Sequence, residues 1–310
     1  MSDEPRDQPE QTTTSSSRPA IAVVIPAYNE QGAVRATVDE VRRILNAAAV
    51  SHDITVVNDG STDGTLAAAR ASGARVLNFP DNIGYGHALK SGIAATDSGL
   101  VGILDADGTY PPSELPVMIR MAAAADMVVG DRGAGMNNVP WVRRPAKWIL
   151  KILASVLARR RINDVNSGLR VFRRTSLERF VHLLPDGYSF TTTITLCMLA
   201  SNLTVVYHPI HYGQRIGHSK IKARHFFKFI FLVLRLTLLF QPLRILLPLG
   251  AVSLAAGVID AIQQRRLTTG AVAGILIAIA IGSIGLLAAV TARRRLQRLE
   301  PKQRDGVVRS

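Results

Sequence analysis

Short apolar runs alternate with helical patterns between residues 20 and 212. The apolar runs have strand length and lie at 21–25, 53–58, 74–79, 100–104 and 126–130. The helical patterns between them lie near 31–49, 63–72, 86–95 and 113–124. Strands that are apolar on both faces and alternate with helices are typical of parallel sheets. We therefore predict an α/β fold with a mostly parallel sheet.

A different pattern follows the α/β region. Residues 245–262 and 270–292 are nearly free of charge, and each run is about long enough to cross a ~30 Å hydrocarbon layer as a helix. We predict a transmembrane hairpin over 242–292. The alternative is a buried helical pair in a soluble core, but soluble helices of this length rarely lack a polar face.

The segments beside the hairpin are more polar. Residues 221–241 are apolar with basic residues spaced through them, so we predict an interfacial amphipathic helix on anionic lipid. A third membrane span is the alternative, but it would place Lys228 and Arg235 in mid-membrane. Residues 1–18 are polar and predict a disordered tail without a signal peptide, and 293–310 form a basic tail.

The charge balance supports a membrane location. Lys and Arg number 37 and Asp and Glu 23, so the formal net charge is +14. The basic residues concentrate before and after the hairpin, and its loop carries only Arg265 and Arg266, so the positive-inside rule predicts that the α/β region and both termini are cytoplasmic. The sequence contains no aromatic RNA-reading motif and no helix-turn-helix pattern, so we do not expect nucleic acid as a partner.

Two further features bear on assembly and chemistry. The only cysteine, Cys197, excludes an intrachain disulfide and lies in an apolar helical segment, where we expect a buried structural thiol. Small residues in GILIAIAIG (274–282) are compatible with a homo-oligomer. They form no G-x-x-x-G face, so the sequence leaves the oligomeric state open.

Polar clusters follow four of the predicted strands. They read PAYNE (26–30), NDGSTDGT (58–65), DADGTYPP (105–112) and GDRGAG (130–135). Any one of them could be an ordinary turn. Because ligands of open α/β sheets bind outside the carboxyl ends of the strands, the four together predict a binding site along one edge of the sheet.

Asp105 and Asp107 carry the most specific chemistry. Two carboxylates at one strand end repel each other unless a cation or a proton lies between them. Hard oxygen ligands with open positions suit Mg²⁺ or Mn²⁺, which completes its shell with water and substrate phosphates. The sequence contains no P-loop, and Gly84 and Gly86 do not complete a dinucleotide fingerprint.

Taken in order, these motifs resemble a known family. PAYNE, NDGSTDGT, NIGYGHAL, DADGTYPP, NSGLRVFRR (166–174) and RIGHSKIK (215–222) follow one another as in inverting glycosyltransferases of family 2. The similarity is greatest to dolichyl- and polyprenyl-phosphate sugar synthases and covers residues 20–245. It implies a GT-A fold over 19–220 and transfer of a sugar from a nucleotide-sugar donor to polyprenyl or dolichyl phosphate.

The resemblance also implies roles on the donor side. Pro26, Tyr28 and Glu30 match residues that hold the nucleotide base and ribose, and Asp59 matches an acid that contacts the same region. Asp105 and Asp107 match the D-x-D pair, of which the second is the usual direct metal ligand.

On the acceptor side the implied residues are basic. Arg132 and Arg170 match residues near the acceptor phosphate, and Arg215 and Lys220 match a late pair that grips phosphate groups. Residues 131–146 match a mobile acceptor loop.

The sequence departs from the family pattern at two places. Thr109 stands where many of these synthases carry a metal-ligating Gln. Residues 186–199 carry threonines where members that glycosylate a sugar hydroxyl usually bear an acidic general base, and Asp186 is the only acid there. A phosphate monoester, with its second pKa near 6, is anionic at neutral pH and needs no base, so a phosphate acceptor is favoured.

Two alternatives remain open. One is transfer to a lipid or glycan hydroxyl with Asp186 as the base. The other is a non-catalytic membrane-anchored module that binds a nucleotide-sugar.

Overall fold

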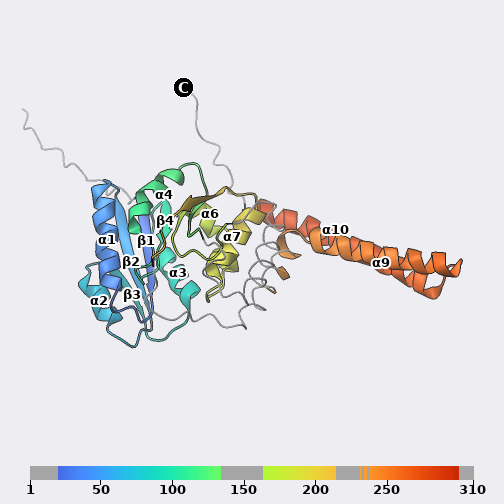
Figure 1. The fold of residues 1–310 in the computed structure, drawn as a ribbon, viewed down its shortest axis with the longest axis horizontal. Coiled ribbons are helices and arrows are strands. Elements are labelled where there is room, and N and C mark those ends of the chain that lie inside the picture. Colours follow the sequence, from blue (N-terminus) through green and yellow to red (C-terminus); the bar gives the residue numbers. More distant parts are fainter. Residues whose placement is uncertain (1–19, 134–162, 214–230, 232–233, 236–237, 300–310) are drawn as a thin grey trace, which may run out of the picture.

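The computed structural model describes residues 20–133, 163–213, 231, 234–235 and 238–299, with side chains described to residue 292 (Figure 1). The strands are β1 (Ile21–Ala27), β2 (His52–Asp59), β3 (Arg75–Phe79), β4 (Leu100–Ile103), β5 (Met127–Asp131), β6 (Arg170–Arg173) and β7 (Val205–Pro209). The main helices are α1 (Val34–Ala47), α2 (Thr65–Ala71), α3 (Tyr85–Ala94), α4 (Leu115–Met121), α6 (Arg174–Glu178), α7 (Phe190–Ala200), α9 (Leu243–Gln264) and α10 (Thr269–Leu299). Two short 3₁₀ turns are η1 (Pro112–Glu114) and η4 (Val181–Leu183).

The seven described strands form one mixed sheet in the order β3-β2-β1-β4-β6-β5-β7. The pairs β1–β2, β1–β4, β2–β3 and β5–β7 are parallel, whereas β6 is antiparallel to both β4 and β5. All strands except β6 therefore end at the same edge of the sheet, and β6 begins at that edge.

Helices cover both faces of the sheet. One buried cluster joins one face of the sheet to α1 and α4; it contains Val23, Val38 and Met118. The other joins the opposite face to α3, α6 and α7; it contains Val24, Leu89 and Phe190. Because β1 is buried on both faces, it needs an unbroken apolar run rather than an alternating one. This three-layer arrangement confirms the predicted α/β class.

α9 and α10 pack as an antiparallel hairpin beyond this layered domain (Figure 1). Glycines allow the close approach: a Cβ on Gly257 would lie 2.9 Å from the carbonyl oxygen of Ala271, and one on Gly274 would lie 2.9 Å from the Cα of Gly257. At the turn, Thr268 donates a hydrogen bond to Asp260. At the base, the Phe240 ring meets the Phe180 ring edge-on, with centroids 6.5 Å apart.

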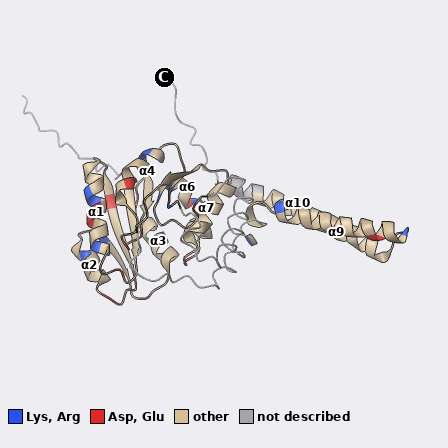
Figure 2. Ribbon diagram, in the orientation of Figure 1, with Lys and Arg blue, Asp and Glu red and all other residues tan. Residues whose placement is uncertain are grey.

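The hairpin surface is apolar. Leu243–Gln264 and Thr269–Ala292 have mean hydropathies of 2.1 and 2.5, and only 6% and 11% of the respective apolar stretches are buried within the structure. Figure 2 shows that charge is nearly absent along the hairpin and lies at its ends. By length and composition, both helices are able to cross a membrane, as the sequence predicts.

The prediction missed two strands. β6 has four residues, and two of them are arginines. β7 ends in His208 and Pro209. Neither has the continuous apolar run that identifies the other strands. The predicted interfacial helix (221–241), the two tails and most of the acceptor loop (131–146) lie largely or wholly outside the described residues.

Candidate active site

The polar segments after β1, β2, β4 and β5 gather at one edge of the sheet because these four strands point the same way. β6 runs the other way, so the segment that precedes it, residues 164–169, also reaches this edge. The segment 210–213 after β7 joins them, since Gly213 N–H donates to the carbonyl of Thr109 at 2.9 Å. Six chain segments therefore surround the candidate site.

Two of these loops are fastened to each other. The Asn29 carboxamide accepts from the Thr62 amide at 2.9 Å, and the Glu30 amide donates to the Thr65 hydroxyl at 2.8 Å. Asn29 has a φ of 57°, a left-handed conformation that Asn tolerates better than most residues. Pro26 is buried in β1, while Tyr28 and Glu30 are half-buried just beyond the strand. The structure thus brings the predicted nucleotide residues into one loop pair.

Asp59 ends β2 and is 3% exposed. One carboxylate oxygen accepts from the Ile83 amide at 3.0 Å, and the other accepts from the Gly84 amide at 2.9 Å. Asp59 therefore shapes the loop before α3. Any contact with a nucleotide would add to this local role.

Asp105 is half-buried just after β4 and is held from two sides. The Tyr85 hydroxyl donates to its Oδ1 at 2.8 Å. Burial first, and then the Asp105 charge, raises the pKa of Tyr85, so the phenol stays protonated and donates. Gly168 lies against the other oxygen, where a Cβ would be only 2.2 Å from Asp105 Oδ2.

Asp107 is held by its own turn. Its Oδ1 accepts from the Thr109 hydroxyl at 2.6 Å and from the Thr109 amide at 3.1 Å. Thr109, which is 3% exposed, is thus a hydrogen-bond donor to Asp107 at the position where the family resemblance implies Gln in many synthases. The hydroxyl orients the carboxylate.

The pair Asp105 and Asp107 fits a divalent cation such as Mg²⁺ or Mn²⁺. The side chains of Tyr85 and Thr109 are neutral donors, so they orient the two carboxylates without neutralising them. Among the described residues no three His, Cys, Asp or Glu side chains gather closely enough to enclose a metal. A two-carboxylate site suits an ion that shares its remaining positions with phosphate and water.

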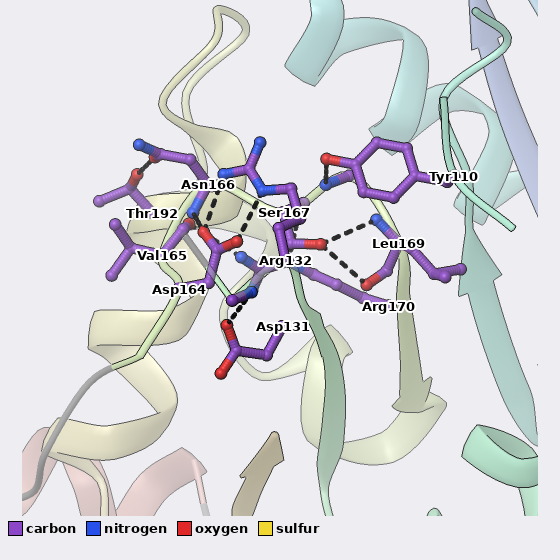
Figure 3. Close-up of polar contacts among 12 residues, drawn as sticks. Tyr110, Asp131, Arg132, Asp164, Val165, Asn166, Ser167, Leu169, Arg170 and Thr192 are labelled. Carbon is purple, nitrogen blue, oxygen red and sulfur yellow. Dashed lines mark hydrogen bonds and ion pairs between the residues drawn. The ribbon is translucent and has the colours of Figure 1, made fainter. Parts of the chain in front are cut away.

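Arg132 follows β5 and binds Asp164 in a bidentate ion pair, with Nε–Oδ2 at 2.6 Å and Nη2–Oδ1 at 2.9 Å (Figure 3). Its guanidinium also lies over the Tyr212 ring, 5.3 Å from the centroid. Burial acts to lower the pKa of Arg132, but the bonds to Asp164 outweigh burial and raise it. The Arg132 side chain is 22% exposed, so this fixed cation remains partly accessible at this edge of the sheet.

The resemblance implies that Arg170 lies near the acceptor phosphate, but the structure buries its side chain. It is the first residue of β6, and its side chain is fully buried. It donates to the carbonyls of Ser167 and Val165 at 2.9 and 2.8 Å and to the Thr195 hydroxyl at 2.6 Å. In this structure it therefore organises protein atoms and offers no surface to a phosphate.

The remaining predicted cations, Arg215 and Lys220, lie outside the described residues. The chain leading to them is placed. Ile210 donates to the carbonyl of Asp131 at 2.9 Å, and the Tyr212 ring packs edge-on against Tyr110 with centroids 5.0 Å apart.

Asp186, the candidate base, pairs with Lys90 at 2.5 Å, and its side chain is 56% exposed. The Lys90 hydrogen bond is the main reason that the pKa of Asp186 lies below its usual value. An efficient general base has a pKa near the working pH, so this pairing argues against that role.

Several site residues were missed from the sequence. Tyr85 lies in NIGYGHAL, Tyr110 in DADGTYPP, and Asp164 two residues before NSGLRVFRR. The sequence could have indicated Asp164, because it is an acid shortly before an arginine-rich segment. Its partner Arg132 is distant in the sequence, so only the fold reveals the pair.

The mixed α/β sheet, with two carboxylates at the ends of its parallel strands, is the scaffold of a ligand-binding enzyme, and comparisons with known proteins identify its family. The model of the family Glycosyl transferase family 2 matches residues 22–181. The chain therefore belongs to glycosyl transferase family 2 and is a glycosyltransferase.

Two similar proteins carry names that state a lipid-phosphate activity. A dolichyl-phosphate hexose transferase of Haloferax volcanii is 32% identical over 65% of this chain and 86% of its own length. A polyprenol monophosphomannose synthase of Mycolicibacterium smegmatis is 31% identical over 65% of this chain and 80% of its own length.

A solved structure shows the same fold. Glucosyl-3-phosphoglycerate synthase of Mycobacterium tuberculosis, in complex with Mn²⁺, UDP-glucose and phosphoglyceric acid, aligns with a TM-score of 0.56 at 23% identity over 70% of this chain and 79% of that one. The predicted GT-A fold is confirmed.

Proposed function

We propose that this enzyme transfers a sugar from a nucleotide-sugar to polyprenyl or dolichyl phosphate at the cytoplasmic face of a membrane. The observation that carries the proposal is that Asp105 of the carboxylate pair lies against Gly168 while Arg132 binds Asp164, so both contact one segment, residues 164–168. A site with paired carboxylates on one side and a cation on the other suits two phosphate-bearing substrates. The names of the relatives support this acceptor class.

The donor nucleotide would bind along the fastened loops that contain Pro26, Tyr28, Glu30 and Asp59. Asp105 and Asp107 would hold Mg²⁺ or Mn²⁺, which when bound neutralises charge on the donor diphosphate. Thr109 and Tyr85 keep these carboxylates oriented before substrate arrives. Preorganised ligands lower the cost of reaching the charged transition state.

The acceptor phosphate would approach from the side of Arg132. We propose that Arg215 and Lys220, which lie outside the described residues, complete the phosphate site. Arg215 follows Gly213 by two residues, a span of at most ~7 Å. An acceptor phosphate oxygen attacks the anomeric carbon as the bond to the nucleoside diphosphate breaks, and the configuration inverts. No base has to remove a proton, because the attacking oxygen is already anionic.

The hairpin would hold this site at headgroup depth. Its apolar helices α9 and α10 would span the bilayer, and the more numerous basic residues on the domain side would face the cytoplasm and its anionic lipids. Residues 221–241 are proposed as the interfacial helix between the domain and the hairpin.

The test compares Asp107→Ala with a matched control, Asp53→Ala. Asp53 is an exposed carboxylate near the start of β2, at the opposite edge of the sheet. The full chain, reconstituted with polyprenyl phosphate, Mn²⁺ and a panel of nucleotide-sugars, should lose transfer about 100-fold or more in Asp107→Ala and keep it in Asp53→Ala. Both variants should still insert in membranes. Full transfer by Asp107→Ala would remove Asp107 from the site.

A further inference from the structure

Arg170 is an unusual residue to find at full burial. Burying a guanidinium is costly unless its donors are satisfied. Three of its hydrogen bonds go to the Val165 carbonyl, the Ser167 carbonyl and the Thr195 hydroxyl, all neutral groups. Two of these acceptors belong to the segment just before β6. The hydrogen bonds of the guanidinium therefore fix the backbone of that segment (Figure 3).

The segment begins at Asp164, which is 5% exposed. Its two carboxylate oxygens take both bonds from Arg132, and Oδ1 also accepts from the Asn166 amide at 2.9 Å. The turn of the segment therefore fixes the carboxylate, and the carboxylate fixes the Arg132 guanidinium. Arg132 can hold this position only while residues 164–166 keep theirs.

The other end of the segment reaches the proposed metal ligand. Gly168 packs against the Asp105 carboxylate, where a Cβ would lie within 2.6 Å of all three carboxyl atoms. Its amide donates to the Tyr110 hydroxyl at 2.7 Å. Close packing against Gly168 thus limits where the Asp105 carboxylate can lie.

Threonines of α7 form hydrogen bonds with the middle and the end of the segment 164–170. The Thr192 hydroxyl donates to the Asn166 side chain at 2.6 Å. The Thr195 hydroxyl accepts from Arg170 and donates to the Thr191 carbonyl at 2.7 Å. The threonines that stand where members acting on a sugar hydroxyl carry a base therefore hold this segment in place.

We propose that residues 164–170 form a bridge that positions Asp105 at one end and Arg132 at the other, with buried Arg170 as its positioning residue. This inference rests on the proposed function, because it assigns donor-metal and acceptor-phosphate roles to the two ends. It adds that a single segment positions both the proposed metal ligand and the proposed phosphate-binding cation. Residues that orient metal ligands typically change metal affinity about 10–100-fold when altered.

Three variants separate the parts of the bridge. Gly168→Ala displaces Asp105 and should weaken Mn²⁺ binding about 10–100-fold. Asp164→Asn weakens the hold on Arg132 and should raise the KM for polyprenyl phosphate about tenfold, with Mn²⁺ affinity near that of the wild type. Arg170→Met should shift both quantities, and Arg170→Lys, which keeps a cationic donor, should recover part of each.

Arg174→Met is the matched control. Arg174 lies just beyond the opposite end of β6 and likewise donates to two carbonyls, of Ser98 and Ile93, and to a threonine hydroxyl, of Thr96. Losing it should lower the Tm as Arg170→Met does, while leaving Mn²⁺ affinity and acceptor KM unchanged.

Mn²⁺ affinity is measured on the full chain in nanodiscs by electron paramagnetic resonance with nucleoside diphosphate present, and acceptor KM by transfer kinetics, below each variant's Tm. If Arg170→Met shifts neither constant more than Arg174→Met, Arg170 is merely structural and the proposal is overturned. If Arg170→Met does not fold, Thr195→Val, which removes one acceptor of Arg170, must show the same joint shift. A wild-type chain that binds no Mn²⁺ overturns the proposed function instead, and the bridge with it.

Discussion

Asp186→Asn distinguishes a phosphate acceptor from a hydroxyl acceptor. The substitution removes the only acid in the segment where a general base is expected, and it breaks the 2.5 Å pair with Lys90. Because Asp186 is 56% exposed, this pair contributes at most about 1 kcal/mol. If all of that appeared in the barrier, the rate would fall about fivefold.

Removing a working general base has a much larger effect, about 10²–10⁴-fold. The lowered pKa of Asp186, caused chiefly by Lys90, leaves it a poor proton acceptor at neutral pH. We therefore expect kcat/KM to change less than about fivefold in Asp186→Asn.

The assay measures kcat/KM for polyprenyl phosphate between about pH 5.5 and 8.5, the range that brackets the second pKa of a phosphate monoester. Asp53→Asn, a change of the same size at the opposite sheet edge, corrects for general effects of losing a carboxylate. A loss above about 100-fold confined to Asp186→Asn, with a missing acidic limb in the pH profile, would refute the phosphate-acceptor reasoning.

Three other predictions follow from described contacts. Tyr85→Phe removes the donor to Asp105 but keeps the buried ring, so Mn²⁺ affinity should fall about tenfold with little change in Tm; unchanged binding would contradict the orienting role. Burial raises the pKa of the Cys197 thiol to about 12, so Ellman's reagent at about pH 8 should modify it only after denaturant is added, and rapid native reaction would contradict the packing. Despite burial, the Arg132 bonds hold the pKa of Asp164 below its ordinary value, so Asp164 stabilises the fold fully above about pH 4, and this contribution is lost as the pH falls through the lower folded-state pKa. The Tm difference between wild type and Asp164→Asn should therefore be large at neutral pH and shrink in acid, and a difference independent of pH would refute it.

The sequence predicts the β2-β1-β4 part of the sheet well because these strands are buried on both faces and need continuous apolar runs. It predicts the Asp105–Asp107 site for a related reason: carboxylates have no packing role after an apolar strand. The same reasoning fails for β6. Arg170 occupies a core position, and its charge is stabilised by hydrogen bonds to the preceding loop and to α7, which no local sequence pattern predicts.

The same limit applies to the cations. From motif order alone, Arg132 and Arg170 receive equal roles beside the acceptor. In the structure the Arg132 side chain stays partly exposed, whereas Arg170 is wholly buried, because its side chain lies on the same face of β6 as Phe172 and reaches Thr195 of α7. The motif does not show which face of β6 is covered by α7, so this distinction required the fold.

The most direct test of the central claim is the identity of the product. Purified full chain is incubated with Mn²⁺ or Mg²⁺, a panel of nucleotide-sugars and polyprenyl phosphate, and the lipid is analysed by mass spectrometry and by the anomeric NMR coupling. We predict one sugar joined to the lipid through its phosphate, with inverted anomeric configuration. A sugar joined to a hydroxyl, or a product of retained configuration, would contradict the account.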